Sequence, residues 1–105
     1  MDSSRLKEIN QDLKDIDVKD VKYYDFTGIH PLFDIAVIGT ATERQALALV
    51  SRLKSYPEFK SAETGSGWTL IATEQIWIHI FTKEERESRG LDDVYAKYEE
   101  VFWLW

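Results

Sequence analysis

The chain has 105 residues, of which 44% are apolar, so it is long enough for one compact core, and we expect a single domain over residues 1–105. Its formal charge of −6, from 13 Lys and Arg against 19 Asp and Glu, argues against a broad cationic surface for binding nucleic-acid phosphates and favours protein partners. The absence of cysteine removes disulfides, thiolate nucleophiles and the usual structural zinc sites.

The start of the sequence lacks the features of a targeting or membrane segment. MDSSRLKEINQDLKDI has no cationic start, no apolar core of a signal peptide and no Arg-rich transit pattern. No run approaches the roughly 20 apolar residues that span a bilayer. We therefore expect an unprocessed, soluble, cytoplasmic protein without membrane contact, and the missing transit pattern favours a bacterial over an organellar source.

The first half of the chain alternates helix and strand patterns. Apolar residues recur at helical spacing between Leu6 and Ile16, and VKYYDF from Val21 and DIAVIGT from Asp34 have strand composition. The second of these runs is apolar on both alternations, as in a central strand covered on both faces. TATERQALALVSRLKSY then predicts a second helix, for which Thr40 with Glu43 or Thr42 with Gln45 offers a capping box.

The second half predicts three strands and further helix. EFKSAET is an edge-strand candidate, and residues 68–72 and 76–81 form the simplest hairpin around the turn-sized TEQ. Thr82 with Glu85 predicts a helix start, and Gly90 a helix end. A last helix beginning near Asp92 carries one apolar stripe, made of Val94, Tyr95, Tyr98, Val101 and Phe102. The order predicts an α/β (α+β-like) fold, a mixed sheet of about five strands flanked by helices.

Motifs of enzymatic chemistry are sparse. The chain has no nucleophile elbow, Walker loop or dinucleotide fingerprint. IGTAT, where Gly39 and Thr40 lead from a strand into a helix, could present backbone N–H groups to a phosphate, and Asp25 with Asp34 could bind magnesium. A helix start uses Gly or Thr for geometry alone, however, which favours a structural role. We expect no cofactor and no catalytic residue.

The two histidines could share a metal ion only with a third ligand, so we expect no metal site. His30 precedes Pro31 and has the composition of a turn. His79 alternates with Trp77 and Phe81 on one strand face, while isoleucines occupy the other. This pattern indicates a polar residue within a sheet that a helix partly covers.

Tryptophan is abundant for so small a chain: Trp68, Trp77, Trp103 and Trp105. These rings either fill the space between sheet and helices or anchor a partner. The tail VFWLW is the best candidate for an exposed apolar patch, which would bind a partner or a second copy of the chain to give a homodimer.

Several segments together resemble the Iojap-like ribosomal silencing factors. FDIAVIGTATERQA is similar to that family's strand and helix start, with Asp34, Gly39, Thr40 and Arg44 at the matching positions. GWTLIA and IWIHIFTKEERESRGLDDVY are similar to its Trp strand, its His strand and the helix that follows. The match keeps its order over about residues 5–95.

The chain departs from the family pattern at polar positions. Ala72 stands where the family has Asp, and Glu74-Gln75 where it has Gly-Asp. Gln45 replaces a His, and Arg89 and Tyr95 replace the family's Tyr and Trp. These departures leave open which of the contacts made by relatives this chain keeps.

The resemblance implies a sheet similar to the nucleotidyltransferase-like fold, used for binding without demonstrated catalysis. It implies a translational repressor that binds the large ribosomal subunit through the fourteenth large-subunit protein and blocks joining of the small subunit, without sequence-specific nucleic-acid binding. By position in the matched motifs, the predicted partner-binding residues are Trp68, Trp77, His79, Phe81, Arg86, Leu91 and Tyr95. The alternatives are a nucleotide- or phosphate-binding enzyme using Gly39-Thr40, and an oligomerising scaffold using VFWLW.

Overall fold

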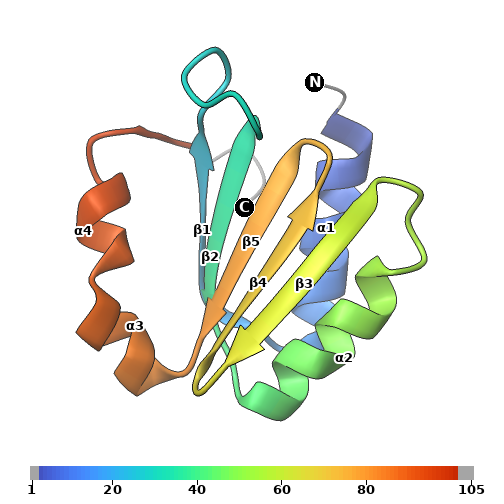
Figure 1. Ribbon diagram of the computed structural model, residues 1–105, viewed down its shortest axis with the longest axis vertical. Helices are drawn as coiled ribbons and strands as arrows, with labels where there is room; N and C mark the ends of the chain where they lie inside the picture. The colour runs from blue at the N-terminus through green and yellow to red at the C-terminus, as the bar shows by residue number, and fades with distance from the viewer. Residues whose placement is uncertain (1–2, 102–105) are drawn as a thin grey trace.

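The computed structural model describes residues 3–101. One six-stranded sheet runs through it in the order β3-β4-β5-β2-β1-β6, with β2 and β5 parallel and the other neighbours antiparallel. The predicted fold class, a mixed sheet flanked by helices, is confirmed (Figure 1). The elements in chain order are α1 (Ser3–Ile16), β1 (Lys19–Asp25), β2 (Ile35–Thr40), α2 (Glu43–Leu53), β3 (Phe59–Gly65), β4 (Trp68–Thr73), β5 (Ile76–Phe81), α3 (Lys83–Arg89), α4 (Leu91–Tyr95) and β6 (Glu99–Glu100).

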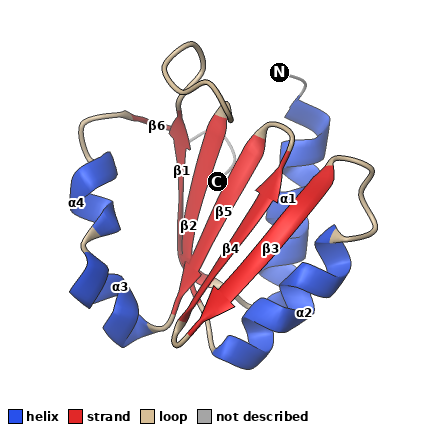
Figure 2. Ribbon diagram, viewed as in Figure 1, coloured by secondary structure: helices blue, strands red, loops and turns tan. Residues whose placement is uncertain are grey.

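Helices lie on both faces of the sheet. Figure 2 shows α1 and α2 on one side and α3 and α4 on the other. The central strand β2 is buried along Ile35–Gly39, because its two alternating sets of side chains face the two helix layers. The predicted central strand is therefore confirmed. The extension of the domain to all of residues 1–105 stays a prediction.

The larger of the two cores lies between the sheet and the α1–α2 layer. It joins the apolar stripe of α1, including Leu6, Ile9 and Leu13, to the isoleucines of β5 and to Leu49 and Leu53 of α2. A buried polar pair lies in this core: the hydroxyl of Tyr23 donates a hydrogen bond to Asn10 Oδ1. Burial raises the pKa of Tyr23 far above its usual range.

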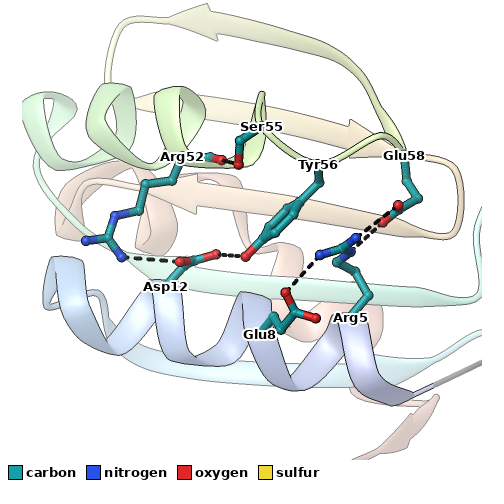
Figure 3. A network of polar contacts seen from close by, with 7 residues as sticks. All are labelled: Arg5, Glu8, Asp12, Arg52, Ser55, Tyr56 and Glu58. Carbon is teal, nitrogen blue, oxygen red and sulfur yellow. Dashed lines mark hydrogen bonds and ion pairs between the residues drawn. The ribbon is translucent and has the colours of Figure 1, made fainter.

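A polar network on the outside of this layer ties α2 and the turn after it to α1 (Figure 3). Arg5 Nε pairs with Glu58 Oε2 at 2.6 Å, and the Tyr56 hydroxyl donates to Asp12 Oδ2 at 2.5 Å. Arg52 Nη1 reaches the other oxygen of Asp12 at 3.2 Å. Because these contacts involve both the start and the middle of α1, they fix its position along α2 as well as its distance from it.

Local sequence signals explain most helix ends. Of the two capping boxes predicted for α2, the structure has the one in which Thr42 Oγ1 accepts from Gln45 N, and Gln45 Oε1 accepts from Thr42 N. Thr82 Oγ1 accepts from Glu85 N at 3.4 Å at the start of α3. Gly90 ends α3 in the left-handed region, with φ of 65°, as predicted.

The hairpin of β4 and β5 is tighter than predicted. Thr73 belongs to β4, so Glu74 and Gln75 alone make the turn instead of the three residues TEQ. The Thr73 hydroxyl donates to Ile76 O at 2.9 Å and accepts from Ile76 N at 3.0 Å. This side chain therefore closes the strand ends across the turn.

The predicted long last helix is wrong. The helix α4 ends at Tyr95, Val94 is 55% exposed, and the chain turns back as β6 to pair with the outer edge of β1. Val101 N donates to Tyr23 O at 2.8 Å, and the Val101 side chain joins the core on the α1–α2 side. The edge of β1 has backbone N–H and C=O groups that β6 pairs with and that another turn of helix cannot satisfy. The sheet therefore has six strands, where the sequence predicted about five. Phe102 lies outside the described residues.

We predict that Tyr23→Phe lowers the free energy of unfolding by about 1–3 kcal/mol, because the buried Asn10 amide oxygen loses its hydroxyl partner. Chemical denaturation measures this difference. The control is Tyr56→Phe, which removes a hydrogen bond to Asp12 at a partly exposed site and should cost less. Equal losses in the two variants would contradict the account of the core.

Candidate partner-binding face

One part of the sheet has helices on one side only. In Figure 1, β3 and β4 lie on the side of the sheet away from α3 and α4. The strand pairing sets Leu70 opposite His79 and Glu63, and therefore on the α3–α4 side of the sheet. Trp68, Leu70 and Trp77 on this side are partly exposed. We call this surface the open sheet face and define it by Ser61, Glu63, Trp68, Leu70 and Trp77.

The two tryptophans of the open sheet face are held by specific neighbours. Trp68 lies across Gly65, where an added Cβ would approach the indole to 2.3 Å, so the site requires glycine. The Arg89 guanidinium sits 5.3 Å from the Trp68 ring centre. Trp77 packs against Phe33, with ring centres 4.7 Å apart. Both rings are therefore fixed before any partner arrives.

The helix α4 covers the neighbouring strands through a cluster of aromatic rings. The Tyr95 ring centre lies 5.7 Å from that of Tyr24 and 5.0 Å from that of Phe26, both in edge-on arrangements. Leu91 and Tyr98 pack on the same cluster. Leu91 and Tyr95 thus hold α4 on the sheet.

His79 lies where the covered part of the sheet meets the open sheet face. Its Nε2 is 3.3 Å from the Tyr95 hydroxyl, and its ring lies parallel to Phe81 with centres 6.3 Å apart. Burial lowers the pKa of His79 to about 4. The imidazole is therefore neutral at pH 7 and acts as a packed polar group between strand and helix.

Arg86 connects α3 to three other parts of the fold. Its Nε and Nη2 donate to the two carboxylate oxygens of Asp92, both at 2.9 Å. Its Nη1 donates to Asp20 O at 2.7 Å and to Thr40 Oγ1 at 2.9 Å. The side chain is only 11% exposed, and the hydrogen bond to Asp92 raises the pKa of Arg86 and lowers the pKa of Asp92. Arg86 therefore positions the α3–α4 layer.

The seven predicted partner-binding residues fall into three groups. Trp68 and Trp77 lie on the open sheet face, and Arg86 lies at the end of the sheet near Thr40. The remaining four, which pack between strand β5 and α4, are His79, Phe81, Leu91 and Tyr95. Leu70 was missed by the prediction, although its alternation with Trp68 on one strand face was visible in the sequence.

The replaced family positions take structural roles. Ala72 is 8% exposed beside the open sheet face, and Glu74 and Gln75 make the hairpin turn. Arg89 pairs with Glu85 at 3.1 Å while it stacks on Trp68.

The Gly39-Thr40 turn is occupied by the protein itself. A Cβ at Gly39 would lie 2.6 Å from the Val18 side chain, so close packing explains the glycine. Thr40 accepts from Arg86, and Ala41 N donates to Phe81 O at 3.0 Å. A pocket of about 430 Å³ beside this turn is lined by three carboxylates, Asp17, Glu43 and Glu84, and by the ammonium groups of Lys19 and Lys83.

Metal ligands do not gather in the described part of the chain. Within residues 3–101, no group of three or more His, Asp or Glu side chains is placed to hold a metal ion. Asp25 accepts a hydrogen bond from Thr27 N at 2.8 Å, and the His30 ring stacks on Phe33 with centres 4.1 Å apart. No helix between residues 3 and 101 has the length and apolar character to cross a bilayer.

The family comparison supports the resemblance stated from the sequence. The family model described as ribosomal silencing factor during starvation matches residues 2–102. The chain belongs to this family. This membership assigns the protein to the regulation of translation, and the family is one of ribosome-associated regulators and not of enzymes.

Solved structures share the fold of this silencing factor. A crystal structure from Bacillus halodurans is similar with a TM-score of 0.78 at 23% identity, over 96% of this chain and 99% of that one. A protein from Chromobacterium violaceum, also a crystal structure, gives a TM-score of 0.77 at 20% identity, over 97% of this chain and 92% of that one. No curated protein matches the sequence.

We predict that the His79 environment makes folding sensitive to acid. The folded pKa of about 4 lies below the ordinary 6.5, so the unfolded chain binds a proton first as the pH falls. The contribution of His79 to stability should decline between about pH 6.5 and about pH 4 by roughly 3 kcal/mol. In denaturation curves at a series of pH values, His79→Gln should remove most of this decline. An unchanged pH dependence in the variant would contradict it.

We predict that Arg86→Lys lowers the free energy of unfolding by about 1–3 kcal/mol, because an ammonium group cannot replace the bidentate pair and the two further hydrogen bonds. Arg89→Lys is the control, since Arg89 is 47% exposed and should change stability by less than about 0.5 kcal/mol. Thermal and chemical denaturation test the pair. Equal effects at the two positions would refute the positioning role of Arg86.

Proposed function

We propose that this silencing factor represses translation by binding the large ribosomal subunit through a basic ribosomal protein, the fourteenth of that subunit, and thereby hindering joining of the small subunit. The observation that carries the proposal is the open sheet face, where Trp68, Leu70 and Trp77 remain partly exposed on a rigid sheet. Such a mechanism requires occupancy and bulk and no chemical step. The protein would act in the cytoplasm, where the ribosomes are.

The open sheet face has the properties of a protein-binding surface. Trp side chains dominate binding energy at interfaces, and these two are already immobilised by Gly65 and Phe33. Preformed anchors lose little side-chain entropy on binding. Leu70 lies between them in the sheet and adds aliphatic area.

The other predicted partner-binding residues support the open sheet face by positioning the helix beside it. His79 and Phe81 lie beneath the edge of α4, and Leu91 and Tyr95 fix α4 beside the open sheet face. Arg86 donates four hydrogen bonds within the chain. We therefore assign it to positioning the α3–α4 layer instead of direct hydrogen bonding with the partner.

The net charge of −6 supports a basic protein as the partner. A negative domain approaches a cationic ribosomal protein with electrostatic steering and is repelled by ribosomal RNA, so charge selects protein over RNA on the subunit surface. Binding should therefore weaken as salt rises.

We predict that Leu70→Lys and Trp77→Ala each weaken binding to purified large subunits by more than about tenfold, because they remove apolar anchors from the open sheet face. Sedimentation of the tagged protein with the subunits measures this. Circular dichroism of each variant checks that the fold is kept.

The matched control is Leu47→Lys, which makes the same charge change at a 57% exposed position of α2, on the other side of the sheet. It should bind as the parent does. If Leu47→Lys weakens binding as much as Leu70→Lys, charge alone is responsible and the assignment of the face is wrong.

A further inference from the structure

The loop between β1 and β2 carries a second apolar surface that the open sheet face does not include. Ile29 is 61% exposed and Leu32 is 59% exposed, and they are three residues apart in this loop, which Figure 1 shows at one end of the sheet. The other large exposed apolar side chains of the described chain, Leu47 and Val94, stand singly on separate helices. Ile29 and Leu32 share one loop, and we call these two residues the loop tip.

Hydrogen bonds hold the backbone of the loop in one shape. Ile29 N donates to Phe26 O at 2.8 Å, and Leu32 N donates to His30 Nδ1 at 3.1 Å. Phe26 N donates to Asp34 O at 2.7 Å and closes the base of the loop. The loop tip is thus fixed by its own contacts, which lowers the entropy lost when a partner binds it.

Aromatic rings support the loop from below and join it to the open sheet face. His30 stacks on Phe33 with ring centres 4.1 Å apart, and Phe33 contacts Phe26 at 5.1 Å and Trp77 at 4.7 Å. Trp77 belongs to the open sheet face. The loop tip and the open sheet face are therefore neighbouring parts of one surface.

Several acidic residues lie at the end of the sheet that carries the loop tip. Asp25 is paired with Ile35 of β2 and with Glu99 of β6. Asp34 lies beside the β4–β5 turn, which contains Glu74, because Asp34 N donates to Gln75 O. The chain has neither Lys nor Arg between Lys22 and Arg44. Lys97, which lies near β6, has its ammonium 5.4 Å from the Tyr98 ring centre. The end of the sheet that carries the loop tip is predominantly acidic.

We propose that the loop tip is a second docking point for the same basic protein partner, which receives Ile29 and Leu32 in an apolar hollow rimmed by Lys or Arg. This inference rests on the proposed function for the identity of the partner. The acidic surroundings disfavour an anionic membrane surface, nucleic acid and a second copy of this acidic end, all of which carry like charge.

The test is binding of purified large subunits by Ile29→Ser with Leu32→Ser in one chain, measured by sedimentation at a series of protein concentrations. Loss of the buried aliphatic area should weaken binding by about tenfold or more. Leu47→Ser is the matched control and should bind as the parent does. Because Ile29 and Leu32 are more than half exposed, the variant should keep its fold.

Charge is tested separately with Asp34→Asn and Glu74→Gln in one chain, which should weaken binding at low salt and reduce its salt dependence. Unchanged binding by the Ile29 and Leu32 variant, with binding lost in Leu70→Lys, would overturn the docking role of the loop tip and leave the proposed function standing. Failure of the parent chain to bind would overturn both. Flotation of the parent with anionic phospholipid vesicles, abolished in the Ile29 and Leu32 variant, would assign the loop tip to lipid instead.

Discussion

The parallel pairing of β2 with β5 is the constraint on which the rest of the structure depends. A strand buried from Ile35 to Gly39 needs apolar cover on both faces, and the chain supplies two helix layers of unequal size to provide it. α1 and α2 cover one face with 14 and 11 residues, whereas α3 and α4 bring only 7 and 5 residues to the other. The shorter layer covers β1, β2 and β5 and leaves the aromatic side chains of β4 and the start of β5 partly exposed.

The small helix layer depends on Arg86 for its position. The bidentate pair with Asp92 links α3 to α4, and the contacts to Asp20 O and Thr40 Oγ1 link both to the ends of β1 and β2. The aromatic cluster around Tyr95 then fixes α4 over His79. A rigid boundary results beside the open sheet face, and rigidity is what a binding surface needs to keep its anchors in place.

Strand identity was predictable because alternation and β-branched composition are local signals. The pattern of Ile76, Ile78 and Ile80 against Trp77, His79 and Phe81 assigned both faces of β5 correctly. The end of the chain was not predictable in the same way, because residues 94–101 fit a helical stripe and turn into β6 only when the edge of β1 is available to pair with. Pairing with β1, which is distant in the sequence, therefore determines the structure of this segment more than its helical pattern of apolar residues does.

In the candidate site, too, local sequence signals predicted some features, and contacts between distant residues determined the others. Motif position pointed to Trp68 and Trp77, and both lie on the open sheet face. The role of Arg86 could not be read from its motif, because its partners Asp20 and Thr40 are 66 and 46 residues away in the chain. Likewise, the glycine of the Gly39-Thr40 turn resembles a phosphate site in sequence, and only the packing of Val18 against it explains why no side chain fits.

The most direct test of the central claim is an electron cryomicroscopy reconstruction of large ribosomal subunits saturated with this protein. The account predicts density in which Trp68, Leu70 and Trp77 contact a protein of the subunit, with α1 and α2 facing away. A complex in which the open sheet face remains exposed to solvent while α1 or α2 contacts the subunit would contradict it.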